Sequence, residues 1–153
     1  MSLLVEAKRP KWVERQLELS KYVGKRIHCS QLQQEEINTI WRRLKSFDSW
    51  GTSKHTFDRL TEKGINATYD DLVSTINNSN IIEYKIDYNE KINRCDERVV
   101  LRANAVVNDT YNLNVVYSIT FGVIITVWMN HINDKHSTLN WELYDENMKV
   151  FGE

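Results

Sequence analysis

What this sequence lacks already limits the kind of protein it encodes. Its two cysteines, Cys29 and Cys95, have no CxxC spacing, so neither a zinc site nor a disulfide framework is indicated. Its longest apolar run, residues 123–129, is too short to cross a bilayer, and the N-terminus has no apolar stretch of the kind found in signal peptides. We therefore expect a cytoplasmic protein with no membrane partner.

Several standard catalytic motifs are also missing. The sequence contains no Walker loop, no GxGxxG, no GxSxG and no HExxH, which argues against nucleotide hydrolysis, dinucleotide chemistry and the common hydrolase families. His131, Asp134 and His136 lie close together, but their spacing matches no standard zinc arrangement, so we expect no metal and no cofactor. His28 and Cys29 lack the partners of a nucleophile and its base, and we interpret them as structural.

The basic residues are concentrated in the first part of the chain. The net charge is −1, yet residues 1–63 hold 13 Lys and Arg against 8 Asp and Glu, whereas residues 64–153 hold 7 against 13. A basic half suits a nucleic acid, an acidic partner or the acidic half of a second copy, so RNA, a protein partner and a homo-oligomer all stay open. The lack of net positive charge argues against non-specific nucleic-acid binding.

The spacing of apolar residues changes near residue 80, and this change predicts an α+β fold. Before it, helical periodicity predicts helices over residues 11–23, 30–47, 53–63 and 68–77, with a capping box at Ser30–Gln33 and an N-cap arrangement at Thr68–Asp71. After it, alternation predicts strands over residues 81–88, 98–107, 112–119 and 123–130, joined by connections that suit antiparallel pairing. We expect one domain, residues 1–153, in which N-terminal helices pack on an antiparallel sheet of about four strands. A last helix is expected over 137–148.

Two groups of polar residues are candidates for chemistry. His55 and Arg59 lie one helical turn apart, so an imidazole that moves protons and a guanidinium that holds anionic oxygens would share a face. The alternative is a solvated helix face beside Asp58. Arg98 and Arg102 lie on one face of a strand, and Thr126 is a lone hydroxyl in an apolar strand, where β-branched threonine is also simply a good strand residue.

The motifs of residues 51–130 together resemble a known family. "SKHTFDRLTEKGINATYDDLVSTINN", a Tyr-containing strand, "RVVLR" and "LNVVYSI…GVIITVWMN" are similar to the barnase–EndoU–colicin–RelE class of small bacterial and phage ribonuclease-like domains, many of them toxins. The resemblance leaves residues 11–48 as a helical extension and residues 131–153 as a C-terminal loop and helix.

The resemblance implies a metal-independent endoribonuclease, in which the RNA 2′-OH attacks the adjacent phosphate. His55 would then be the general acid and base, Arg59 and Arg98 would stabilise the phosphorane, and Thr126 would orient the substrate. Arg102 and Lys63 would bind substrate, although Lys63 stands where the group commonly has a second arginine. The alternative is a non-catalytic protein-binding module of prophage origin on the same scaffold, which would bind an antitoxin or another protein through residues 11–48.

Overall fold

A six-stranded mixed sheet forms the centre of the computed structural model, which describes residues 9–60, 67–107 and 110–133 with Tyr144, Asp145, Met148 and Val150. In spatial order its strands are β1 (Arg26–His28), β3 (Ser79–Asn89), β4 (Arg94–Val107), β5 (Tyr111–Ser118), β6 (Val123–His131) and β2 (Gly51–Thr52). Neighbouring strands are antiparallel except β2 and β6. The predicted α+β class is confirmed, but about four strands was too few, because β1 and β2 are too short to show alternation.

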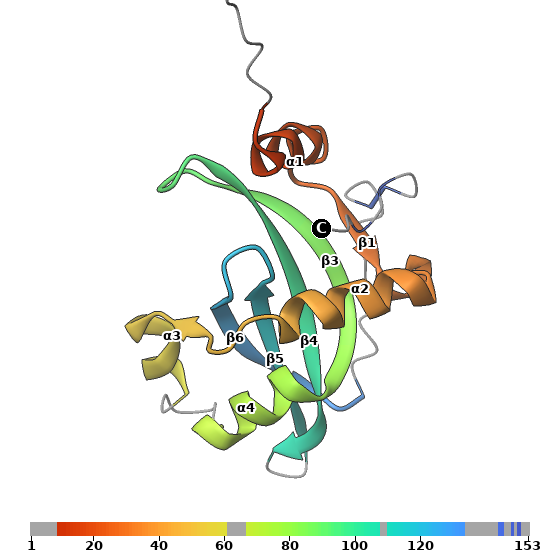
Figure 1. Ribbon diagram of the computed structural model, residues 1–153. Helices are drawn as coiled ribbons and strands as arrows, with labels where there is room; N and C mark the ends of the chain where they lie inside the picture. Colours follow the sequence, from red (N-terminus) through yellow and green to blue (C-terminus); the bar gives the residue numbers. More distant parts are fainter. Residues whose placement is uncertain are drawn as a thin grey trace, which may run out of the picture.

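Four helices cover one face of this sheet or its edge: α1 (Lys11–Ser20), α2 (Gln34–Lys45), α3 (Lys54–Arg59) and α4 (Tyr69–Asn77). In Figure 1, α2 crosses in front of β3 and β4, and α4 lies below α2. Helix α1 lies at the top, near the end of the sheet at which β3 is joined to β4. Thr68 is the N-cap of α4, as predicted, and it forms a capping box with Asp71. The box of α2 is Gln33 with Glu36 rather than Ser30 with Gln33, because Ser30 lies in a separate 3-10 turn, Cys29–Gln31.

The hydrophobic core lies between the helices and one face of the sheet. Tyr84, Val99, Tyr117 and Ile124 are neighbours across four strands, and all are buried together with apolar residues of α2 and α4. We call this side the helix-covered face. Because side chains alternate along a strand, the opposite face carries Asp96, Arg98, Val100 and Arg102 of β4.

A bulge in β3 corrects the predicted pattern of that strand. The sequence pattern placed Ile82 on one face with Tyr84 and Ile86, but the register shifts between Ile81 and Glu83. As a result Ile81, opposite Leu101, is the residue buried in the core. A bulge inserts one extra residue and so breaks the period of two on which the prediction rested.

The turn between β5 and β6 depends on Gly122. Its φ of +69° lies in the left-handed region, and an added Cβ would come within 2.5 Å of the Phe47 ring. The sequence predicted that this connection suits antiparallel pairing, and β5 and β6 are antiparallel. Phe47, just after α2, therefore packs directly against the turn backbone.

The last part of the chain is described at only a few positions. The helix expected over residues 137–148 falls largely outside the described residues, although Tyr144 forms an isolated parallel bridge with Arg26. Within the part of the chain that the structure describes, no helix combines the length and the apolar character that crossing a membrane requires.

Candidate functional site

The short helix α3 holds the first group of predicted site residues at the edge of the sheet. Ser53 caps it by accepting a hydrogen bond from the Thr56 amide, and the Thr56 hydroxyl donates to the Ile125 carbonyl of β6. Thr56 and Leu60 are buried, so this side of α3 faces the protein. Arg59 is half-buried, and its Nε has no hydrogen-bond partner among the described residues. The His55 side chain and Lys63 lie outside them.

Arg98 lies on β4 and is held by two carboxylates. Its Nε donates to Asp96 Oδ2 at 2.8 Å, and its Nη1 donates to Asp87 Oδ2 at 3.3 Å. Lys85, opposite Arg98 on β3, also approaches Asp87 at 3.5 Å. The two cations are therefore matched by two carboxylates, and Arg98 carries little excess charge with which to hold a phosphate.

Arg102 and Thr126 lie on the same sheet face as Arg98. Arg102 donates to the side-chain oxygen of Asn112 and to the backbone carbonyl of His131. Thr126, on β6, lies opposite Val116 of β5. Among the described contacts, no hydrogen bond or ion pair joins α3 to Arg98. The structure thus groups Arg98, Arg102 and Thr126 on one face, and it places α3 beside β6.

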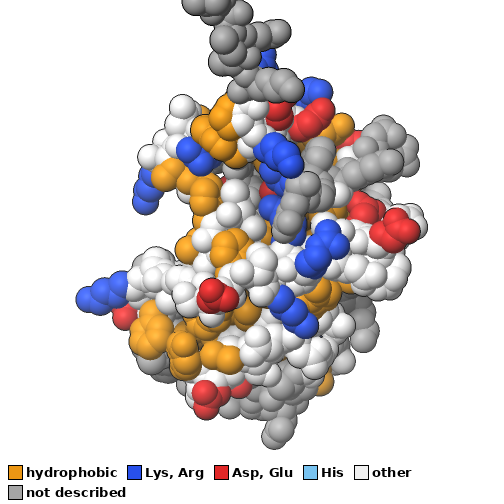
Figure 2. Space-filling view, viewed as in Figure 1, with side chains coloured by type: hydrophobic (Ala, Val, Ile, Leu, Met, Phe, Trp, Pro, Cys, Tyr) orange, Lys and Arg blue, Asp and Glu red, His pale blue; other side chains and the backbone are white. Residues whose placement is uncertain are grey.

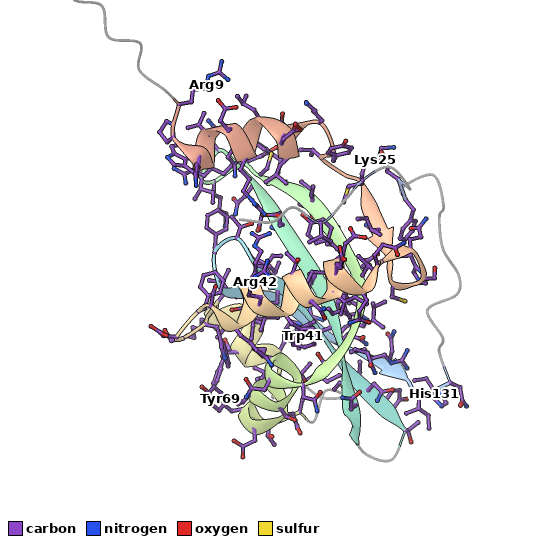
Figure 3. The ribbon with its side chains drawn as sticks, turned by 45° about the vertical axis from the view of Figure 1, so that its right-hand side comes forward. Arg9, Lys25, Trp41, Arg42, Tyr69 and His131 are labelled. Atoms are coloured by element: carbon purple, nitrogen blue, oxygen red, sulfur yellow. The ribbon has the colours of Figure 1, made fainter. Side chains whose placement is uncertain are left out.

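His131 lies at the end of β6, across the molecule from Arg9 (Figure 3). Its Nδ1 accepts a hydrogen bond from the Asn133 amide. Within the described ranges no group of three potential ligands could hold a metal ion, and Asp134 and His136 fall outside those ranges. Burial raises the pKa of the Cys29 thiol and of the Cys95 thiol, so neither is activated as a nucleophile.

The most heavily paired polar group in the described structure is Glu97, on the helix-covered face of β4. Its side chain is fully buried, with 0% exposure. Arg43 of α2 donates to both carboxylate oxygens at 2.6 and 2.7 Å, and Arg15 of α1 donates to both at 2.8 and 3.1 Å. The Tyr84 hydroxyl donates to Oε1 at 2.7 Å. This one carboxylate therefore ties α1 and α2 to the centre of the sheet.

Burial alone would raise the pKa of Glu97, but the hydrogen bonds and charges of Arg43 and Arg15 outweigh it and hold the pKa below its usual range. The neighbouring Tyr84 hydroxyl has a pKa well above its usual value, first because it is buried and then because Glu97 is negatively charged. Glu97 is thus a carboxylate, and Tyr84 donates the proton in their hydrogen bond. The arrangement is a charged cluster with fixed geometry rather than a proton-transfer pair.

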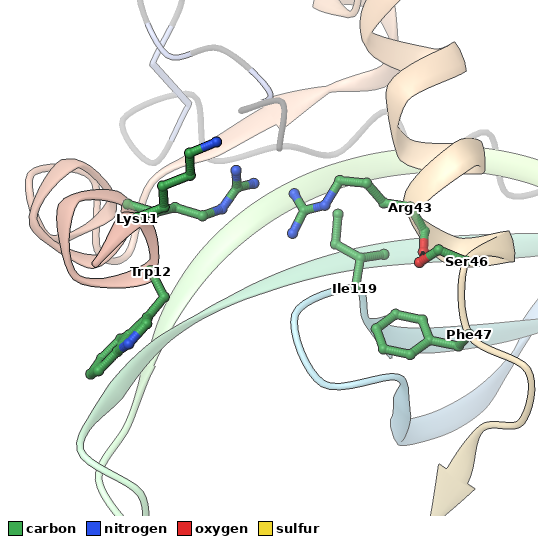
Figure 4. A pocket seen from close by; sticks show the side chains of 7 residues that line it. Lys11, Trp12, Arg43, Ser46, Phe47 and Ile119 are labelled. Atoms are coloured by element: carbon green, nitrogen blue, oxygen red, sulfur yellow. Dashed lines mark hydrogen bonds between the residues drawn. The ribbon is translucent and has the colours of Figure 1, made fainter.

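A cavity of about 300 Å³ opens beside this cluster, between α1 and α2. Figure 4 shows Lys11 and Trp12 of α1 across the cavity from Arg43, Ser46 and Phe47, with Ile119 between them; Arg15 completes the lining. No Asp or Glu is among the described lining residues. In Figure 2, Lys and Arg side chains lie beside hydrophobic ones on this face of the molecule.

A second hollow lies close to Trp12. It measures about 420 Å³ and is lined by Ile92, Arg94 and Phe121. The Arg94 guanidinium stands over the Trp12 ring, 4.1 Å from its centroid, and so joins the two hollows. Trp12 itself is 52% exposed, and Ile92 is also exposed. Together these residues form what we call the Trp12 surface: Lys11, Trp12, Arg15, Arg43, Phe47, Ile92, Arg94, Ile119 and Phe121.

The Glu97 cluster was not predicted from the sequence, although two signals of it are present there. Extending the alternation of Val99 and Leu101 backward puts Glu97 on the buried face, where a carboxylate needs a cationic partner. Arg43 falls on the buried stripe of α2, since it lies three residues after Ile40 and next to Leu44. A buried acid on a strand and a buried base on a helix are together a reason to expect an ion pair.

The fold and the site can now be set beside known proteins. Comparison of the chain with protein-family models and with curated proteins found no match, and comparison with solved structures found none either. What the structure defines is therefore a class: an α+β protein with helices on one face of a mostly antiparallel sheet and a cationic, partly aromatic cavity between its first two long helices.

Proposed function

We propose that this protein is a non-catalytic binding module whose Trp12 surface docks another protein. One observation carries the proposal: the cavity between α1 and α2 has three cationic side chains and no acidic one in its described lining, together with exposed aromatic surface. Depletion of acidic residues and enrichment of Trp, Phe and Arg are typical of protein interfaces.

The scaffold and origin of the module are part of the same proposal. The resemblance of residues 51–130 supports a RelE/barnase-like scaffold of phage or mobile-element origin, and helices packed on one face of a largely antiparallel sheet are compatible with it. In this proposal residues 11–48 are the extension that supplies the interface, since α1 and α2 carry most of the cavity lining.

The test compares two exposed aromatic residues on different helices. Trp12→Ala removes the centre of the Trp12 surface, whereas Phe57→Ala removes an exposed ring from α3. In affinity capture from cells of the natural host followed by sedimentation, we expect the wild type and Phe57→Ala to retain the same partner and Trp12→Ala to lose it. If Trp12→Ala retains that partner equally well, the proposed interface is wrong.

A metal-independent endoribonuclease is the second candidate. It is favoured by the grouping of Arg98, Arg102 and Thr126 on one sheet face, as the resemblance implies. The purified protein should then cleave RNA in EDTA and leave 2′,3′-cyclic phosphate ends, and His55→Ala should abolish cleavage while His131→Ala should not. Cleavage that survives His55→Ala would exclude the assigned mechanism.

A further inference from the structure

We infer that the hollow lined by Ile92, Arg94 and Phe121 binds an aromatic side chain of the partner, whose ring packs on the two apolar residues and stacks on the Arg94 guanidinium. We call this part of the Trp12 surface the Arg94 hollow. The inference rests on the proposed binding function and names the side chain that the partner inserts. It follows from the apolar lining of the hollow, its fixed shape and the contact between Arg94 and Trp12.

The apolar lining of the Arg94 hollow is the first argument. Ile92 lies in the turn between β3 and β4, and Phe121 lies in the turn between β5 and β6, so the hollow opens between two turns. Ile92 is 46% exposed, which leaves much of its side chain uncovered by the rest of the chain. Its volume of about 420 Å³ has room for one large side chain. Apolar surface gathered around a hollow in this way is typical of interaction sites.

The fixed shape of the turn that carries Ile92 is the second argument. The pairing of β3 with β4 extends to Asn89 opposite Arg94, directly at the turn. Within the turn, the Asn89 side chain accepts a hydrogen bond from the Lys91 amide at 3.1 Å, and Asn93 takes the left-handed conformation, with a φ of +53°. Ile92 and Arg94 are therefore placed before any ligand arrives, and the ligand does not bear the entropic cost of ordering the turn.

The contact between Arg94 and Trp12 is the third argument. The guanidinium lies 4.1 Å from the centroid of the Trp12 ring, and Figure 4 shows this ring extending from α1 toward the β3–β4 hairpin. Gln16, one helical turn after Trp12, donates to the backbone carbonyl of Cys95 at 3.0 Å and accepts from its amide at 2.7 Å. Because Cys95 follows Arg94 directly, these two bonds fasten α1 to β4 beside the stacked pair. The fold itself thus holds the guanidinium at the hollow.

A guanidinium beside apolar side chains favours an aromatic ligand over an aliphatic one. A cation attracts the electron-rich face of an aromatic ring, and the planar guanidinium suits stacking on such a face. Phe121 adds a second aromatic contact. An aliphatic side chain would gain the apolar contacts in the hollow but not the attraction to Arg94. The match is therefore one of electrostatic complementarity combined with apolar packing.

The same features favour a protein side chain over a nucleobase. The described lining of the Arg94 hollow consists of one cation and two apolar side chains, whereas a site for single-stranded nucleic acid combines its stacking rings with a basic groove that follows the phosphates. The chain as a whole carries a net charge of −1. An uncharged aromatic side chain, rather than a base on a polyanion, is therefore the better match.

The experiment uses the full chain with three probes. The first is an acetylated and amidated pentapeptide, Ser-Ala-Phe-Ala-Ser, the second is the same peptide with cyclohexylalanine in place of Phe, and the third is oligouridylate. Binding is followed by NMR through the Ile92 methyl groups and the Trp12 indole N–H. Cyclohexylalanine keeps the bulk of the ring and removes its π electrons. We expect the Phe peptide to bind about two- to fivefold more tightly than the cyclohexyl peptide, as a cation–π contact at an exposed site implies.

Two arginine variants of equal charge change locate the effect. Arg94→Met keeps an unbranched side chain and removes the cation, so it should abolish the preference for the Phe peptide. Arg42→Met alters an exposed arginine of α2 that is not among the described lining residues of either hollow, and it should leave the preference unchanged. Because both arginines are exposed, we expect both variants to fold, and the amide NMR spectrum of each variant checks this.

Equal or tighter binding of the cyclohexyl peptide would overturn the inference, because a hollow that recognises apolar bulk alone gives that result. A Phe preference that survives Arg94→Met would also overturn it, and so would shifts that only oligouridylate produces. These outcomes are separable from failure of the proposed function. If Trp12→Ala abolishes capture of a protein partner while both peptides bind alike, the interface stands and only the aromatic preference is wrong. If Trp12→Ala retains the partner and both peptides bind alike, both proposals fail.

Discussion

Asp96 and Glu97 are consecutive buried carboxylates on β4, and the pleat of the strand sends them to opposite faces of the sheet. Asp96 accepts hydrogen bonds from the Ser118 hydroxyl and from Arg98. The same arginine also donates to Asp87. Glu97 is surrounded by two arginines and a tyrosine from three other elements. On the Asp96 side two carboxylates share one arginine, whereas on the Glu97 side two arginines bond one carboxylate.

This difference shows two ways in which the sheet holds a buried acid. Arg98 bonds two carboxylates on its own face of the sheet, Asp87 and Asp96. Arg15 and Arg43 come from two helices and bond the same carboxylate, Glu97. The sequence drew attention to Arg98 because it lies in a recognisable strand motif, but the described contacts form the larger network around Glu97.

The largest expected effect comes from breaking the Glu97 cluster. Arg43→Met should lower the free energy of unfolding by about 3–5 kcal/mol, because it leaves a buried carboxylate without its bidentate partner. Arg98→Met on the opposite side should lower it by about 1–3 kcal/mol, since Ser118 still bonds Asp96 and the Arg98 side chain is partly exposed. Urea unfolding followed by circular dichroism measures both. Equal losses would mean that the two sides do not differ as described.

Two buried tyrosines provide a second test of the cluster. Tyr84→Phe should lower the free energy of unfolding by about 1.5–3 kcal/mol, because its hydroxyl donates to a charged carboxylate. The Tyr117 hydroxyl is buried with no hydrogen-bond partner among the described residues, and burial raises its pKa to about 12. Tyr117→Phe should therefore leave stability unchanged or raise it slightly. The same urea experiment applies, and a larger loss for Tyr117→Phe would contradict this assignment.

The pH dependence of stability should reflect Glu97. Its pKa is lower in the folded protein than in the unfolded chain, so the unfolded chain binds the proton first as pH falls. The contribution of Glu97 is fully present above the usual pKa of a carboxyl group, and it declines as pH drops toward the folded value, by at most about 1.4 kcal/mol per pH unit. Glu97→Gln should show a shallower decline than the wild type between neutral and acidic pH. An identical slope would exclude Glu97 as a source of acid sensitivity.

The smallest effect on stability is expected for Lys11→Gln. Lys11 is exposed at the start of α1 and lies outside the Glu97 cluster, so the change in the free energy of unfolding should stay within about 0.5 kcal/mol. A normal thermal unfolding curve for this variant would confirm that Lys11 contributes little to the stability of the fold. A substantial loss of stability would instead make Lys11 part of the structural cluster.

The helices and the central strands could be predicted because their signals are local. Caps such as Ser53 and Thr68, the helical spacing around Ile40 and Leu44, and the alternation of Val99 and Leu101 all depend on neighbouring residues. The strands β1 and β2 gave no such signal, since two or three residues pair only because the rest of the sheet is present. The bulge at Ile81–Glu83 was missed for a related reason: its position depends on pairing with β4.

The candidate site was harder to predict than the fold. Arg15, Arg43 and Glu97 come from α1, α2 and β4, and Glu97 is 82 residues from Arg15 and 54 from Arg43. Their burial hinted at pairing, but which acid meets which base depends on how the helices cross the sheet. Arg98 shows the opposite case, a residue that the sequence pattern singled out. That pattern could not reveal that Asp87 and Asp96 bind Arg98.

The consecutive carboxylates of β4 also bear on which strand pairing the protein can adopt. If β4 slipped by one residue against β3 and β5, Asp96 or Arg98 would take the place of Glu97 under α2. Arg98 in that place would bring a third guanidinium against Arg43 and Arg15 with no buried acid between them, and Asp96 would be one methylene too short to span both. The charges on β4 therefore select against misaligned sheets during folding, a role separate from any ligand that the cavity binds.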